Sequence, residues 1–221
     1  KNDVLPNIIV IISDDQGYAD VGFHGSKEVF TPNIDRIASN GVIFSDGYVS
    51  YAVCSPSRAG LITGRYQNRF GYSRNILLTP KDSTMGLPLT EQTLPDVLRK
   101  ANYKTKAIGK WHLGAHESLI PESRGFDEFY GFIIGGHRYF PDDLILNDLK
   151  EARSQMDGYI TKLLDNGKRI KTSKYLTEEL SDNAVKFIDE NFDDPFFLYL
   201  SYNAPHTPLQ ATEKDLKRNM H

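Results

Sequence analysis

Residues 7–13 form a short, almost entirely aliphatic run that stops at two adjacent carboxylates, Asp14 and Asp15. An apolar run of this length predicts a strand buried on both faces, as in a parallel sheet covered by helices. The chain is therefore expected to fold around this strand. No apolar run in the sequence approaches the roughly 18 residues that a membrane-spanning helix needs.

The composition is that of an ordinary globular protein. The 221 residues are enough for one large domain or two small ones, and the 39% hydrophobic and 25% charged shares exclude disorder. A net charge of −3 provides no general positive field, so nucleic-acid binding is not expected. The single cysteine, Cys54, excludes an internal disulfide and a zinc site built from several cysteines.

Strand and helix patterns alternate along the rest of the chain. Thr31 is expected to cap a helix over 31–38 that ends near Gly41, and Thr93 is expected to cap another helix. The other expected elements are strands at 42–44, 106–109 and 196–200 and helices at 56–63 and from about 177. The alternation predicts an α/β fold with a mostly parallel central sheet flanked by helices.

A polar insert covers residues 140–175. Within it, Asp165-Asn166-Gly167 predicts a type I′ hairpin turn, because asparagine and glycine tolerate the positive φ angles of that turn. The insert contains no recognisable specificity motif. Residues 215–218, close to the end of the sequence, are typical of an unfinished helix.

Polar groups follow three of the predicted strands, where ligands of parallel sheets bind. Asp14 and Asp15 follow the first strand, Lys110 and His112 the second, and His206 the last. Two adjacent carboxylates repel one another unless a cation lies between them, and oxygen ligands favour calcium or magnesium. Taken alone, the Asp-Asp pair is more typical of a solvated turn.

Cys54 precedes a predicted helix, and Arg58 lies one turn into it. A lone cysteine is usually a small buried apolar residue. Here the helix N-terminus and the guanidinium make its surroundings electropositive, which suits an anionic ligand or a nucleophile.

The same segment resembles a known signature. Cys-Ser-Pro-Ser-Arg at 54–58, followed by Leu-Ile-Thr-Gly-Arg at 61–65, closely resembles the motif of the type I, formylglycine-dependent sulfatases of the alkaline phosphatase-like superfamily. Further segments resemble that family in the same order, namely 7–15, 31–35, 109–114, 125–131 and 204–206. The resemblance covers the chain except for 140–175, and it identifies residues 1–221 as the N-terminal part of a sulfatase catalytic domain.

The resemblance implies a chemical role for residue 54. In sulfatases the motif cysteine is oxidised to formylglycine, whose hydrate attacks sulfur with one hydroxyl and expels sulfate through the second. It implies that Asp14, Asp15 and the modified residue 54 bind calcium, with magnesium as the alternative. Arg58 resembles the residue that holds the hydrate.

The resemblance assigns the remaining polar groups as well. Lys110 resembles a sulfate ligand, His112 the group that deprotonates the second hydroxyl, and His206 a sulfate-binding general acid. Considered singly, each is also compatible with a solvated surface side chain. His137 follows two glycines in a predicted loop and is a candidate substrate contact.

The match is incomplete. In the family an Asp-Asn pair and a second lysine complete the site, and their positions would lie beyond His221. The metal site of the chain as it stands is therefore expected to be incomplete, and its activity in isolation doubtful.

The sequence predicts a sulfatase that hydrolyses sulfate monoesters of a carbohydrate or glycan. The alternatives are a phosphatase or phosphonate hydrolase of the same superfamily and an inactive sulfate-binding fragment. The expected partners are the sulfated substrate and a formylglycine-generating enzyme. The resemblance implies a periplasmic, secreted or lysosomal location after loss of a signal peptide.

Overall fold

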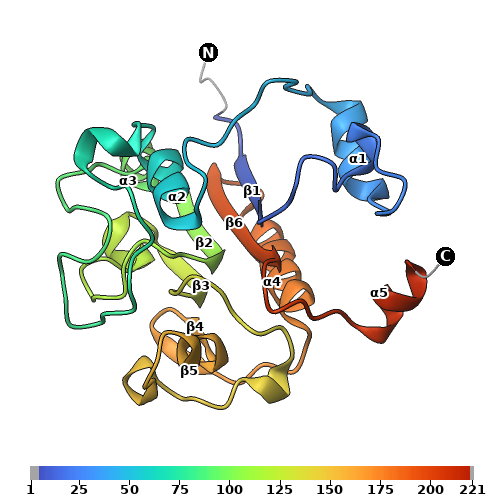
Figure 1. Ribbon diagram of the computed structural model, residues 1–221. Helices are drawn as coiled ribbons and strands as arrows, with labels where there is room; N and C mark the ends of the chain where they lie inside the picture. Colours follow the sequence, from blue (N-terminus) through green and yellow to red (C-terminus); the bar gives the residue numbers. More distant parts are fainter. Residues whose placement is uncertain (1–4, 220–221) are drawn as a thin grey trace.

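The computed structural model describes residues 5–219 and contains one six-stranded sheet in the order β1-β6-β2-β3-β4-β5 (Figure 1). The first four strands in this order are mutually parallel, and the last two run antiparallel to their neighbours. The strands are β1 Ile8–Asp14, β2 Lys104–Lys110, β3 Glu128–Phe132, β4 Leu163–Asp165, β5 Lys168–Ile170 and β6 Phe196–Pro205. The predicted α/β fold with a mostly parallel sheet is confirmed.

Five α-helices connect or flank the strands in the described part of the chain. They are α1 Pro32–Asn40, α2 Cys54–Thr63, α3 Leu94–Lys100, α4 Leu176–Asn191 and α5 Glu213–Arg218. Short 3₁₀ helices are η1 Gly22–His24, η2 Gln67–Phe70, η3 Pro121–Arg124, η4 Pro141–Asp143, η5 Leu149–Glu151 and η6 Met156–Ile160. Within residues 5–219, none of these helices combines the length and the apolar character needed to cross a bilayer.

The sheet separates two apolar cores. On one face, Phe197 and Tyr199 of β6 pack in a cluster with Ala59 and Ile62 of α2. On the other face, the alternate β6 residues pack against α4. The α4 contribution to that second cluster is Leu176, Leu180, Ala184 and Phe187. The central strand β6 is therefore covered on both faces, which fixes the position of its carboxyl end.

The first strand differs from its prediction. Ile8, Val10 and Ile12 pack on the α2 side, whereas Ile9 and Ile11 are 44% and 56% exposed. β1 pairs only with β6 in the described residues, and α4 does not extend over its second face. The expectation of a strand buried on both faces was wrong. Apolar side chains allow both faces of a strand to be buried, but whether each face is buried depends on which elements pack against it.

Residues 42–44, predicted as a strand, have no regular secondary structure and are exposed. They follow α1, which buries none of its residues and lies away from the sheet in Figure 1. Because no strand among residues 5–219 lies beside this segment, its backbone has no partner for the hydrogen bonds of a sheet. Gly41 follows α1 as predicted, although its backbone is extended (φ −129°) rather than left-handed.

Most other local predictions are confirmed. Thr93 caps α3 in a capping box with Asp96. β4 and β5 form the predicted hairpin, in which Asn166 and Gly167 both have positive φ (46° and 76°), as a type I′ turn requires. A helix is present at 215–218 (α5), but the expectation that it is unfinished was wrong: it ends at Arg218, where the Asn219 amide caps it by donating to the Leu216 carbonyl.

Candidate active site

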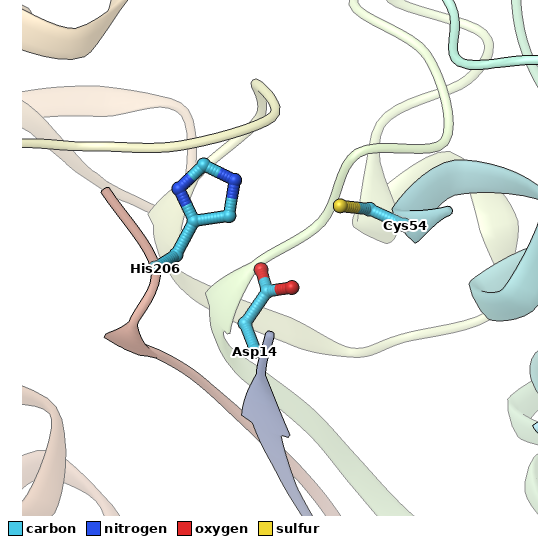
Figure 2. A group of neighbouring side chains, drawn as sticks. All are labelled: Asp14, Cys54 and His206. Carbon is cyan, nitrogen blue, oxygen red and sulfur yellow. The ribbon is translucent and has the colours of Figure 1, made fainter. Parts of the chain in front are cut away.

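The polar groups predicted at three strand ends meet at one edge of the sheet. Asp14 ends β1, Lys110 ends β2 and is followed by His112, and His206 directly follows β6. Ligating atoms of Asp14, Cys54 and His206 all lie within 4.8 Å of one another. Figure 2 shows these three side chains converging from β1, from the start of α2 and from the segment after β6. The parallel order of β1, β6 and β2 produces this meeting point.

Asp14 is the anionic centre of the cluster and is only 5% exposed. Its Oδ2 accepts a hydrogen bond from Arg58 Nη2 at 3.3 Å and forms an ion pair with Lys110 Nζ. Arg58 Nη1 also donates to the Lys110 carbonyl at 2.9 Å and to the Ser201 hydroxyl. Two buried cations therefore share one buried carboxylate, so the buried part of the cluster has an excess of positive charge, which suits an anionic ligand.

The sequence predicted that Cys54 would precede the helix. In the structure it is the first residue of α2. Neighbouring side chains anchor this end of the helix: Asn75 Oδ1 accepts from the Ser55 amide at 3.0 Å, and Ser55 Oγ donates to the His112 carbonyl at 2.6 Å. The Ser55 hydroxyl also bonds Tyr72 OH at 2.7 Å. These bonds hold the start of α2, and with it the Cys54 sulfur, against the end of β2.

His112 is 6% exposed and has a positive φ of 59°, an uncommon conformation for a residue with a side chain. Its amide donates to the Ile133 carbonyl at 3.0 Å. A side chain at Gly135 would collide with the imidazole, because a Cβ there would lie 2.8 Å from the ring. The glycine therefore allows the backbone to approach the ring and fixes its position in the site.

His206 and Asp15 form the solvent-facing side of the cluster. His206 Nε2 lies 3.4 Å from Asp15 Oδ2, and the Asp15 side chain is 61% exposed. Asp15 also has a positive φ of 58°, so the chain turns sharply after Asp14. As a result, Asp14 points into the buried cluster while Asp15 faces His206.

Burial controls the protonation of the inner groups. It raises the pKa of the Cys54 thiol, an effect that the Lys110 charge partly offsets. It lowers the pKa of Lys110, with the Arg58 charge acting in the same direction. Burial, followed by the charges of Lys110 and Arg58, lowers the pKa of His112 well below its usual value, so this imidazole is neutral near pH 7. A neutral imidazole can accept a proton.

A pocket of about 260 Å³ opens over the cluster. Its polar end contains Cys54, His112 and His206, and its other walls are largely apolar. Those walls come from residues 75–78, from Ile133 and Ile134 after β3, and from Gln155, Met156 and Tyr159. The site therefore combines a polar floor with a mostly apolar entrance.

His137 does not reach this pocket. It is fully buried, its Nδ1 and Nε2 face the carbonyls of Arg138 (2.9 Å) and Thr161 (2.7 Å), and its ring packs on Phe132. Burial lowers its pKa to about 4. The expectation that His137 contacts substrate must be corrected: the glycines before it lead the chain into the core, where the ring joins two backbone segments.

Three residues of the site were not identified from the sequence. Ser201 accepts from Arg58 and is the first polar side chain after the apolar start of β6, so the same strand-end argument that identified Asp14 would have found it. Asn75 lies in an irregular segment and Tyr159 in the short helix η6, and no sequence pattern there indicates their place in the pocket.

Comparison with known proteins adds an independent line of evidence. A sequence model of the sulfatase family matches residues 6–219. N-acetylgalactosamine-6-sulfatase of Homo sapiens is 36% identical over 220 residues, covering 94% of this chain and 41% of that protein. Arylsulfatase J of Mus musculus is 36% identical over 209 residues, covering 93% of this chain and 33% of that protein.

Solved structures share the fold. Ps i-CgsB, solved in complex with k-i-k-neocarrahexaose, has 46% identity and a TM-score of 0.86, covering 97% of this chain and 48% of that one. A protein solved with its substrate D-glucosamine-2-N,6-O-disulfate has 28% identity and a TM-score of 0.73, covering 95% of this chain and 36% of that one.

The chain thus spans between about a third and two fifths of the length of the curated sulfatases named above, and the family match extends over nearly all of the chain. The family predicted from the cysteine motif is confirmed. This chain belongs to the sulfatase family.

Proposed function

We propose that the protein containing this chain hydrolyses sulfate monoesters of a glycan, using residue 54 as formylglycine. The observation that supports this most strongly is the meeting of Cys54 with Asp14 and His206 beside two buried cations. Sulfate esters are anionic, and buried cations that exceed the local negative charge favour binding of such a group. Relatives and structural neighbours carry sulfatase names or sulfated ligands.

The residues present suit a divalent cation. Asp14 and Asp15 offer carboxylate oxygens, and the Cys54 sulfur, where formylglycine oxygens would lie, is within 4.8 Å of the Asp14 carboxylate. Oxygen ligands of this kind favour calcium, with magnesium as the alternative. When bound, the cation supplies Lewis-acid polarisation of sulfate oxygens, and formylglycine supplies the attacking hydroxyl.

The protein side chains have separate tasks in this proposal. Arg58 and Lys110 bind and orient the anionic groups, because both are buried and already directed at Asp14. Neutral His112 would accept the proton of the residue-54 hydroxyl that does not attack sulfur. His206, which lies at the pocket, donates a proton to the departing sugar oxygen.

The identity of the glycan rests on the comparisons and not on the geometry of the site. We take an oligosaccharide of the k-i-k-neocarrahexaose class as the first substrate to test, because the neighbour solved with it shares 46% identity with this chain. N-acetylgalactosamine 6-sulfate is the second, from the human relative. The same proposal includes maturation by a formylglycine-generating enzyme and a periplasmic, secreted or lysosomal location.

Residues 1–221 are, in this proposal, the N-terminal part of the catalytic domain. The support is that this chain covers only 41% of the human relative and 33% of the mouse one, together with the exposed apolar side chains on β1 and α1. The function is tested on the complete gene product. The experiment compares sulfate release from the two glycans and from 4-nitrophenyl sulfate with phosphate release from 4-nitrophenyl phosphate. Faster phosphate release would favour the phosphatase alternative, and no release of either anion would favour an inactive sulfate-binding protein.

A further inference from the structure

Tyr159 occupies a position in the pocket that neither the family motifs nor the catalytic groups explain. It belongs to η6, in the insert at 140–175, and lines the same pocket as Cys54, His112 and His206. Its ring meets the His206 ring edge-on, with 6.4 Å between centroids and an interplanar angle of 61°. His206 is the proposed proton donor to the leaving sugar, so Tyr159 lies on the leaving-group side of the site.

Backbone contacts fix Tyr159 in this position. The Tyr159 carbonyl accepts from the Arg138 amide at 2.9 Å, and the ring packs so closely on Gly136 that a Cβ there would lie 2.7 Å from ring carbons. One turn earlier, Gln155 Oε1 accepts from the Leu78 amide at 2.7 Å, which ties the insert to the pocket wall formed by residues 75–78. The ring is therefore held before a ligand arrives, which lowers the entropic cost of binding.

The Tyr159 hydroxyl is not used inside the protein. Among residues 5–219 it makes no hydrogen bond, although the tyrosine is only partly exposed. The other tyrosines nearby differ in this respect: Tyr139 bonds the carbonyls of Asn203 and His206, and Tyr175 bonds that of Gln210. A phenol is protonated at neutral pH, so Tyr159 offers a donor at the pocket surface.

The surroundings of Tyr159 suit a ligand ring that has both apolar and polar parts. Leu78, Ile134 and Met156 line the pocket beside it, while the polar floor lies towards Cys54. A pyranose has apolar C–H faces and a rim of hydroxyl groups. It can therefore lay one face on the aromatic ring while a rim oxygen accepts from the phenol.

We propose that Tyr159 is a specificity-determining residue, whose ring supports the sugar that carries the sulfate ester and whose hydroxyl donates to a neighbouring sugar oxygen. This inference rests on the proposed function and adds the residue that distinguishes a glycan ester from a bare sulfate group. It also assigns a role in substrate selection to the insert, which the sequence left unexplained.

The test separates sugar binding from sulfate binding and from turnover. The complete gene product carrying Cys54→Ala cannot form formylglycine, so calorimetry with k-i-k-neocarrahexaose measures binding without hydrolysis. In that background Tyr159→Phe should weaken hexasaccharide binding about threefold to tenfold, the effect of one hydrogen bond. Tyr159→Ala should weaken it at least about tenfold, because the ring is lost as well. Binding of inorganic sulfate should change less than about twofold in both variants.

Tyr66→Phe is the matched control, since Tyr66 is 55% exposed and outside the pocket lining. It should leave both ligands unaffected. Hexasaccharide binding that is unchanged in Tyr159→Ala, or equal losses for hexasaccharide and sulfate, would overturn the inference and leave the proposed function intact. If the parent neither binds the hexasaccharide nor hydrolyses any sulfate ester, the proposed function fails and the inference fails with it.

Discussion

The Asp14 carboxylate and the Arg58 guanidinium, 44 residues apart in sequence, meet at 3.3 Å in the interior, with side chains only 6% and 4% exposed. The contact joins the end of β1 to the helix that begins with Cys54. Lys110, from the end of β2, shares the same carboxylate oxygen. One ion cluster therefore sets the relative positions of the three elements that supply the site.

Replacing Asp14 by Asn should destabilise the protein because Arg58 and Lys110 would keep their buried charges without a counter-charge. Removing one partner of a buried ion pair costs about 3 kcal/mol or more in the free energy of unfolding. Urea denaturation in the presence of EGTA measures this effect without a contribution from bound cation. Asp15→Asn is the matched control: its 61% exposed side chain should contribute less than about 1 kcal/mol. Equal losses for both variants would contradict a buried ion cluster centred on Asp14.

Removal of divalent cations should abolish sulfatase turnover of the complete gene product, because Asp14 and Asp15 would no longer bind the cation that polarises sulfate. Adding calcium back should restore the rate, and calcium titration after EGTA treatment is the measurement. Full activity after exhaustive chelation would exclude the proposed metal role.

Cys54→Ala should eliminate turnover while leaving the fold intact, because the start of α2 tolerates a small side chain. Sulfate release and circular dichroism together measure the two effects. In the parent, mass spectrometry of the tryptic peptide that contains residue 54 should show formylglycine in place of cysteine. An active protein whose residue 54 is entirely unmodified cysteine would disprove the proposed nucleophile.

His206→Ala should slow hydrolysis of a glycan sulfate far more than that of 4-nitrophenyl sulfate. A sugar alkoxide needs a proton as it leaves, whereas a nitrophenolate scarcely does, and general acid catalysis contributes about a hundred- to ten-thousand-fold. The ratio of kcat values on the two substrates is the measurement. Equal losses on both would limit His206 to sulfate binding and require another proton donor.

His137 should make the protein less stable in acid. Burial lowers its pKa in the folded state to about 4, whereas the unfolded value is near 6.5. Between these values the unfolded chain binds the proton and the folded chain does not, so stability falls as pH decreases from about 6.5 to about 4. The loss is on the order of 3 kcal/mol.

Urea midpoints from pH 7 to pH 4, compared between the parent and His137→Gln, measure this contribution. The variant should lose less stability over that range. His24→Gln is the control, because His24 lies in an exposed segment. A His137 variant with the same pH slope as the parent would show that His137 does not titrate within this window.

The sequence predicted the positions of the site residues along the chain more reliably than their surroundings. Strand ends are marked by an abrupt change from apolar to polar residues, so Asp14, Lys110 and His206 could be assigned to one sheet edge. The motif at 54–58 identified the family, and the Asn166-Gly167 turn followed from local backbone preferences. These features depend on short stretches of chain, and local physical chemistry determines them.

Only the tertiary structure decided which side chains share a space. The burial of His137, the exposure of Ile9 and Ile11, and the absence of a strand at 42–44 all depend on what packs against each segment. Tyr159 reaches the pocket because Gly136 and Leu78, from other parts of the chain, fix the insert beside His206. Sequence patterns record the period and polarity of a segment but not its distant neighbours, so contacts of this kind appear only when the chain is folded.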